Sequence, residues 1–133
     1  MPRVSAWFVR TALCHLVVGF TVGALLLADK GVPIAPGLWT LRAAHVEVLL
    51  MGWIVQLVMG VAVWILPRFA VRRAPQRSAV TAWLAFALLN GGVLCVALGG
   101  GWVMVGRLAE IAAAVSIVAH LWGRVSPAGL SAI

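Results

Sequence analysis

Long apolar runs separated by short polar stretches dominate the chain. The first run covers about 6–28 and stops at Asp29, and the second covers 38–66 and stops at Pro67. A helix needs about 20 residues to cross the hydrocarbon core of a membrane, and both runs exceed that length. The pattern therefore predicts membrane-spanning helices rather than strands.

The second half of the chain holds a charge-free stretch over 78–106. One untilted helix of this length would overshoot a hydrocarbon core of about 30 Å, since each helical residue rises about 1.5 Å. The three glycines at 99–101 supply the break, so we expect spans over 78–98 and 102–123. Four spans with short connectors predict an antiparallel four-helix bundle, all-α, as a single domain over 1–133.

The composition supports an integral membrane protein. Hydrophobic residues make up 64% of the chain and charged residues only 10%, whereas soluble domains carry about 25% charged residues. We therefore expect the lipid bilayer, and not nucleic acid, to be the partner of this basic chain, and no soluble catalytic domain. The two cysteines, Cys14 and Cys95, lie inside apolar runs and are predicted to be buried core residues, not a disulfide.

The charges are distributed unequally between the two ends of the predicted bundle. The end with both termini collects seven arginines and no acid: Arg3, Arg10, Arg68, Arg72, Arg73, Arg77 and Arg124. The opposite end holds three basic and all three acidic residues. Because Lys and Arg near span ends favour the cytoplasmic side, we expect both termini in the cytoplasm, with the protein in a bacterial inner membrane.

Three histidines lie within the predicted spans. His15 follows Arg10, and His120 precedes Arg124, by a few residues each. If these arginines mark the cytoplasmic boundary, the two histidines lie at matched depth and can face each other across the bundle. His45 belongs to the opposite half, so it is not expected to share a metal atom with either of them in one protomer.

Small residues recur on the same helical faces as two of these histidines. The faces comprise Gly19 and Gly23 after His15, and Gly52, Gln56 and Gly60 after His45. Small residues beneath a histidine permit either close helix packing or space for a flat macrocycle. The second interpretation makes Gly19 and Gly52 part of a haem-binding surface.

Four charged residues form a second group of candidates. Arg107 and Glu110 are three residues apart and are expected to pair along one helix. Glu47 lies at similar depth but does not share a helical face with His45. Two interpretations stay open: charge pairing that also includes Arg42, or a metal or proton site formed by a histidine and carboxylates.

The second predicted span resembles a known family. The segment His-Val-Glu-Val-Leu-Leu-Met-Gly-Trp at 45–53, with Met-Gly at 59–60 and Trp-Ile-Leu-Pro-Arg at 64–68, is similar to the second helix of haem-copper oxidase subunit I. The similarity is closest to the cbb3-type oxidase and nitric oxide reductase branch. The resemblance implies haem b, with His45 as an axial iron ligand. The end of the chain from His120 also resembles the tail of short four-helix subunit I-like proteins.

The chain departs from that family in ways that limit its chemistry. It has no tyrosine and nothing that matches the copper-binding helices, so we do not expect it to act as an oxidase on its own. The expected function is haem b binding for electron transfer or diatomic-gas sensing, in a homo-oligomer (trimer or dimer) with a redox partner. Two alternatives are a cofactor-free accessory subunit of a respiratory complex, docking through the glycine stripes, and a small metal or proton conduit.

Overall fold

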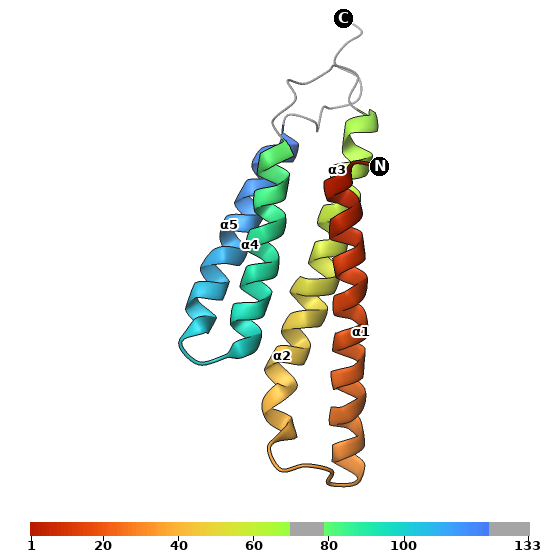
Figure 1. Cartoon of the computed structure of the whole chain (residues 1–133), viewed down its shortest axis with the longest axis vertical. Helices are drawn as coiled ribbons and strands as arrows, with labels where there is room; N and C mark the ends of the chain where they lie inside the picture. Colours follow the sequence, from red (N-terminus) through yellow and green to blue (C-terminus); the bar gives the residue numbers. More distant parts are fainter. Residues whose placement is uncertain (70–78, 123–133) are drawn as a thin grey trace, which may run out of the picture.

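Every regular element in the part of the chain that the structure describes is a helix. The computed structural model describes residues 1–69 and 79–122 (Figure 1). The elements are α1 (Arg3–Gly31), η1 (Leu38–Leu41), α2 (Arg42–Glu47), η2 (Val48–Val55), α3 (Gln56–Phe69), α4 (Ala79–Leu98) and α5 (Trp102–Leu121). The stretch from η1 to α3 is one nearly continuous helical segment, called here the second segment.

The predicted four-helix pattern is confirmed. Within the described residues, four helical stretches are long and apolar enough to cross a membrane: Arg3–Gly31, Leu38–Leu66, Ala79–Leu98 and Trp102–Leu121, with 29, 29, 20 and 20 residues. The predicted break between the last two is also present, since α4 ends at Leu98 and α5 begins at Trp102. Gly99 and Gly100 make this turn with positive φ angles of 75° and 59°. Residues with a Cβ are strained at positive φ angles, which explains why glycines separate the two helices.

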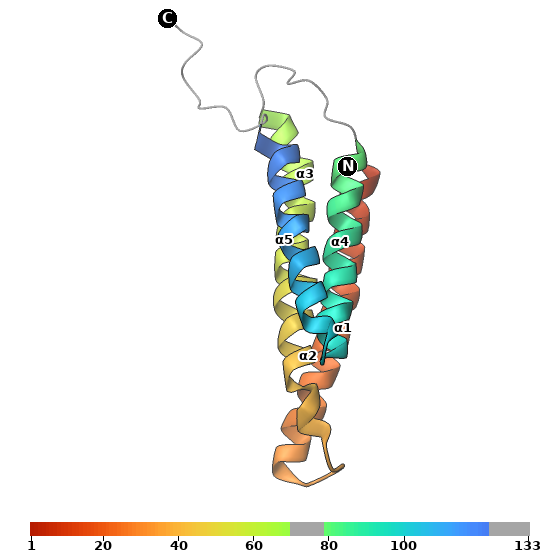
Figure 2. The ribbon, with the colours of Figure 1, turned by 90° about the vertical axis from the view of Figure 1, so that its left-hand side faces the viewer.

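The helices are arranged as two hairpins. In the first, α1 packs against the second segment, and the pairs Ser5–Gly60, His15–Gly52 and Gly23–His45 define an antiparallel register. In the second, α4 packs against α5. Figures 1 and 2 show the hairpins side by side, with α1 and α4 beginning at the same end of the molecule.

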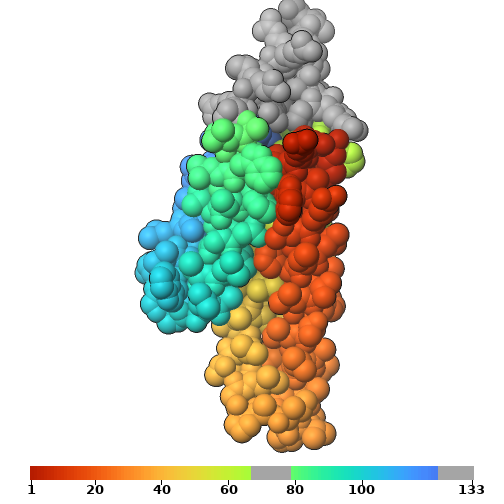
Figure 3. Space-filling view, viewed as in Figure 1, coloured from red at the N-terminus to blue at the C-terminus, as the bar shows by residue number. Residues whose placement is uncertain are grey.

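The first hairpin is longer than the second. The 29 residues of α1 correspond to about 43 Å of helix, whereas the 20-residue helices of the second hairpin correspond to about 30 Å. Figure 3 shows the first hairpin continuing past the turn of the second. At the far end of α1, Asp29 Oδ1 accepts hydrogen bonds from the backbone N–H groups of Ile34 and Ala35 at 2.7 and 3.1 Å. This carboxylate therefore shapes the connector that turns the chain into the second segment.

The core lies where the two hairpins meet. Phe8 of α1 is fully buried, and its ring packs edge-on against Phe86 of α4 with 5.2 Å between the centroids. Within the second hairpin the backbones approach closely, because a Cβ on Gly92 would lie 2.9 Å from the carbonyl oxygen of Gly106. The prediction that both cysteines are buried is wrong: Cys14 is exposed and Cys95 is only partly buried, because their helical faces point away from this core.

The second segment contains a feature that the hydrophobic pattern does not predict. Over Val48–Val55 it widens into a π-helix, which begins directly after Glu47 and includes Gly52. π-helical turns occur often at functional sites. This turn directly follows Glu47, whose carboxylate contacts α5, and it contains Gly52, whose carbonyl oxygen contacts His15 of α1.

Candidate functional site

Two histidines tie α1 to the second segment through reciprocal contacts. His15 Nδ1 of α1 lies 3.0 Å from the carbonyl oxygen of Gly52, and His45 Nδ1 of α2 lies 2.8 Å from the carbonyl oxygen of Gly19. Each of the two helical segments therefore supplies one histidine, whose imidazole contacts a backbone carbonyl of the other segment. Both rings are only partly buried.

Glycines make these contacts possible. A Cβ on Gly52 would lie 2.8 Å from Cγ of His15, and a Cβ on Gly23 would lie 2.6 Å from Cε1 of His45. A Cβ on Gly19 would overlap the side chain of Leu49. The predicted common face of the second segment is confirmed, and it faces α1. Its glycines serve close packing within the chain, which is one of the two interpretations that the sequence leaves open.

The hydrogen bonds determine which nitrogen of each ring carries a proton. A carbonyl oxygen only accepts, so Nδ1 of His15 and of His45 must donate. In a neutral imidazole the other nitrogen, Nε2, then keeps its lone pair. Histidines that ligate metals are commonly held in this way, with one ring N–H bonded to a backbone carbonyl and the other nitrogen on the metal.

His15 and His45 occupy different levels of the bundle. His15 contacts Gly52, which is seven residues after His45 on the second segment. At the rise of a helix this is an axial separation of about 10 Å. The two histidines therefore lie at different levels, as the sequence predicts.

The predicted pairing of His15 with His120 is wrong. His120 lies near the end of α5, is buried, and its Nδ1 is 2.8 Å from Thr81 Oγ1 at the start of α4. Phe8 of α1 and Phe86 of α4 are in contact, so they mark one level along the bundle axis. His15 follows Phe8, whereas Thr81, the partner of His120, precedes Phe86, so the two histidines lie on opposite sides of that level, roughly 12 to 18 Å apart along the axis. Arg10 lies inside α1 and does not mark its boundary. Because α1 begins at Arg3, His15 lies much deeper than His120.

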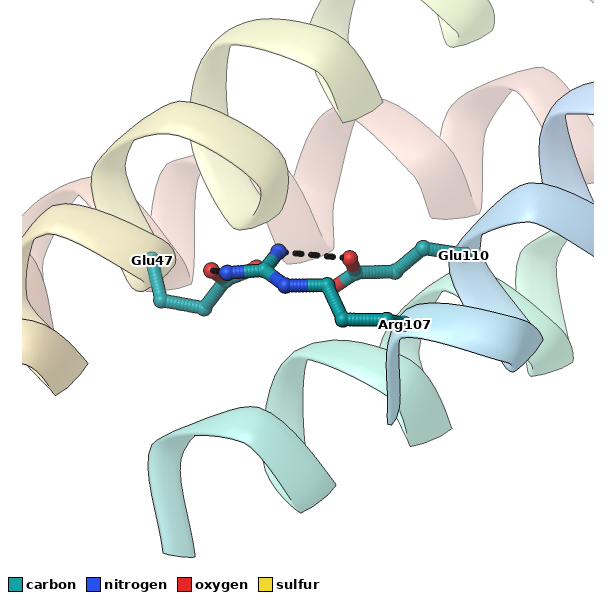
Figure 4. Close-up of polar contacts among 3 residues, drawn as sticks. All are labelled: Glu47, Arg107 and Glu110. Atoms are coloured by element: carbon teal, nitrogen blue, oxygen red, sulfur yellow. Dashed lines mark hydrogen bonds and ion pairs between the residues drawn. The ribbon is translucent and has the colours of Figure 1, made fainter. Parts of the chain in front are cut away.

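The charged candidates meet on the other side of the second segment. Arg107 Nη2 lies 2.7 Å from Glu47 Oε2, and Arg107 Nη1 lies 2.8 Å from Glu110 Oε2. Figure 4 shows the two carboxylates converging on one guanidinium from different helices. The predicted pairing of Arg107 with Glu110 is confirmed, as is the charge pairing with Glu47. Arg42 is exposed, and no ion pair among the described side chains joins it to this cluster.

This cluster, called here the carboxylate–arginine cluster, is unevenly exposed. The side chains of Glu47 and Glu110 are only 5% and 4% exposed, whereas that of Arg107 is 48% exposed. Each carboxylate uses one oxygen on Arg107, and its second oxygen, Oε1, is buried without a hydrogen-bond partner. Two carboxylates and one guanidinium leave one formal negative charge.

A site that combines His45 with Glu47 and Glu110 is not formed. His45 points to α1 and Glu47 to α5, because the two residues lie on different faces of the same helix. Among the described residues, no group of three or more His, Cys, Asp or Glu side chains is placed to hold a metal ion. A metal held by a single protein ligand is a separate case, for which Nε2 of His15 and Nε2 of His45 are the candidate donors.

Two polar contacts between α1 and α3 are absent from the sequence-based candidates. Ser5 Oγ donates to the carbonyl oxygen of Gly60 at 2.6 Å, and Gln56 Nε2 donates to that of Phe8 at 3.4 Å. Both side chains are completely buried. Their positions on the faces that carry the glycines were the available signal.

Comparisons with known proteins add no relatives, since no protein-family model, curated protein or solved structure matches this chain.

Proposed function

We propose that this protein is a multi-pass membrane protein that binds haem b through a single histidine. The observation that carries the proposal is the contact of His45 Nδ1 with the Gly19 carbonyl oxygen at 2.8 Å, which leaves Nε2 as a metal ligand. The resemblance of 45–53 to the haem-ligating helix of haem-copper oxidase subunit I supports the same residue. His15 has the same arrangement and is the alternative ligand.

The proposed placement is a bacterial inner membrane, with both termini in the cytoplasm. Four apolar helices of sufficient length support membrane insertion. The excess of arginine near the chain ends and in the loop between the hairpins supports the orientation. The N-terminus and the beginning of α4 lie at the same end of the molecule, as this orientation requires (Figure 1).

Residues of α1 hold and orient the proposed iron ligand, His45. The carbonyl oxygen of Gly19 fixes the tautomer of His45, and Gly23 leaves room for its ring. When bound, haem supplies one-electron redox chemistry and an iron that binds diatomic gases. Haem needs no three-residue metal cage, so the donor set present here fits it.

Single-histidine ligation favours gas binding over electron transfer. The chain has three histidines. His15 and His45 lie at different levels between α1 and the second segment, and His120 lies between α4 and α5. Iron held by one histidine of the chain would keep a coordination site for a diatomic gas. Electron transfer by a six-coordinate haem would instead need a second copy to supply a ligand, as in the expected dimer or trimer.

The test is a visible spectrum of the protein purified after expression with added haem. We expect a Soret band, a five-coordinate ferrous form, and a shift of the band on adding carbon monoxide. His45→Ala should abolish the band or reduce haem occupancy at least about 10-fold, the usual scale for losing a metal-site interaction. His120→Ala is the matched control, because His120 lies on the other helix pair. A colourless wild-type protein, or equal haem loss in both variants, contradicts the proposal.

The accessory-subunit alternative loses its main support. It relied on glycine stripes as docking surfaces, but Gly19, Gly23, Gly52 and Gly60 all contact side chains of this chain. Docking to a respiratory complex would have to use other surfaces.

A further inference from the structure

The carboxylate–arginine cluster brings two acids and one base together where the two hairpins meet. Glu47 of α2 and Glu110 of α5 are only 5% and 4% exposed, and they pair with Arg107 at 2.7 and 2.8 Å. The two carboxyl groups are also close enough for a hydrogen bond to each other. Three ionised side chains would leave one negative charge at this contact, and an uncompensated buried charge is strongly destabilising.

The second hairpin supplies no further charge to the cluster. α4 packs against Glu110 through Gly92, since a Cβ on this glycine would lie 2.7 Å from Cγ of Glu110. No residue of α4 is charged, and its only titratable side chain is Cys95. Arg107 and Glu110 are the only charged residues of α5, and His120 lies at the far end of that helix. A balancing charge would therefore have to come from the first hairpin or from a proton.

The first hairpin supplies no balancing charge either. The π-helical turn after Glu47 has no titratable side chain, and α1 and α3 carry their charged residues toward their ends. His15 and His45 contact backbone carbonyl oxygens between α1 and the second segment. Arg42 is exposed, and among the described side chains only Arg107 forms an ion pair with either carboxylate. A proton is the remaining source of the missing charge, and it needs no cavity.

Glu110 is the acid better placed to hold that proton. It packs into the close contact of α4 with α5, where α4 offers it no charged partner. Arg107 precedes Glu110 on the helix, which is the less favourable order for an ion pair along a helix. Two carboxylates in one site do not both stay ionised, because each charge disfavours the other, and a protonated carboxyl group can donate a hydrogen bond that a carboxylate cannot.

We propose that Glu110 is protonated and donates a hydrogen bond to Glu47, which stays ionised beside Arg107. This hydrogen bond then locks the second segment to α5, and removal of the proton at high pH loosens the contact between the hairpins. The lock does not depend on haem, because both proposed iron ligands lie at the contact with α1.

Infrared spectroscopy of the purified protein in detergent detects the proton directly. A protonated carboxyl group has a C=O stretching band that an ionised carboxylate lacks. We expect the wild type to show this band near neutral pH and to lose it as the pH is raised, whereas Glu110→Gln should lack it throughout. Asp29→Asn changes the only other acid of the chain and is the matched control, which should keep the band. The wild-type measurement does not depend on the folding of any variant.

Chemical unfolding at a series of pH values tests the lock itself. Because the folded protein holds a proton that the unfolded chain releases, the ratio of the wild-type to the Glu110→Gln unfolding constant should rise about tenfold per pH unit until Glu110 ionises in the folded protein. The glutamine amide donates to Glu47 without titrating, and the other titratable groups are common to both proteins. A wild type without the band, a band that persists in Glu110→Gln, or a constant ratio of the unfolding constants overturns the proposal.

Discussion

His15 Nδ1 of α1 lies 3.0 Å from the carbonyl oxygen of Gly52, and the ring rests directly on this glycine. Gly52 belongs to the π-helical turn of the second segment. One residue therefore provides both the acceptor that orients the imidazole and the absence of a side chain that lets the ring approach. The stability of the first hairpin should depend on it.

Replacing Gly52 with alanine should destabilise the protein. The new Cβ would lie 2.8 Å from Cγ of His15, so the ring or a helix must move. Overpacking of this kind costs about 1–3 kcal/mol. Gly91→Ala is the control, since nothing lies within 4 Å of a Cβ at Gly91. That variant should be unchanged or more stable, because alanine favours helix. Thermal unfolding in detergent measures both, and equal loss in the two variants would contradict the prediction.

The turn between α4 and α5 should tolerate side chains at only one of its three glycines. Gly99 and Gly100 have φ angles of +75° and +59°, whereas Gly101 has a φ of −64°. Alanine at Gly99 or Gly100 should each cost about 1–2 kcal/mol, because left-handed backbone is strained for residues with a Cβ. Gly101→Ala should be nearly neutral. Chemical unfolding of the three single variants checks this order.

Replacing Arg107 with glutamine should be severely destabilising. The change leaves Glu47 and Glu110 buried without their common partner, and breaking a buried ion pair costs about 3–5 kcal/mol. The triple variant in which Glu47, Arg107 and Glu110 are all glutamine should recover much of this loss, because it buries no charge. Arg42→Gln, which changes an exposed arginine, serves as the control. Additive losses in the triple variant would show that the cluster does not act as a unit.

Ser5→Ala should weaken the contact between α1 and α3. The hydroxyl is completely buried and donates to the carbonyl oxygen of Gly60 at 2.6 Å. Its removal should cost about 1 kcal/mol, the usual net value of such a hydrogen bond. Ser116→Ala is a matched control, since Ser116 bonds a carbonyl within its own helix at an exposed position. A difference between the two variants of less than about 0.5 kcal/mol would argue against the prediction.

The amino-acid sequence by itself determined the number, the type and most of the limits of the helices. Apolar runs of fixed length and the glycines at 99–101 encode these features locally, so no tertiary contact is needed to find them. It also determined that Arg107 and Glu110 pair, since residues three apart on one helix are neighbours.

The tertiary structure decided which residues meet across helices. Depth estimated from flanking arginines placed His15 beside His120, but the register between helices is fixed by glycine contacts far apart in the sequence, such as Gly52 on His15. The π-helical turn, the reciprocal histidine contacts and the partner of Glu47 depend on the same long-range packing. A helical pattern determines which face a residue occupies, but only the packed bundle determines what that face touches.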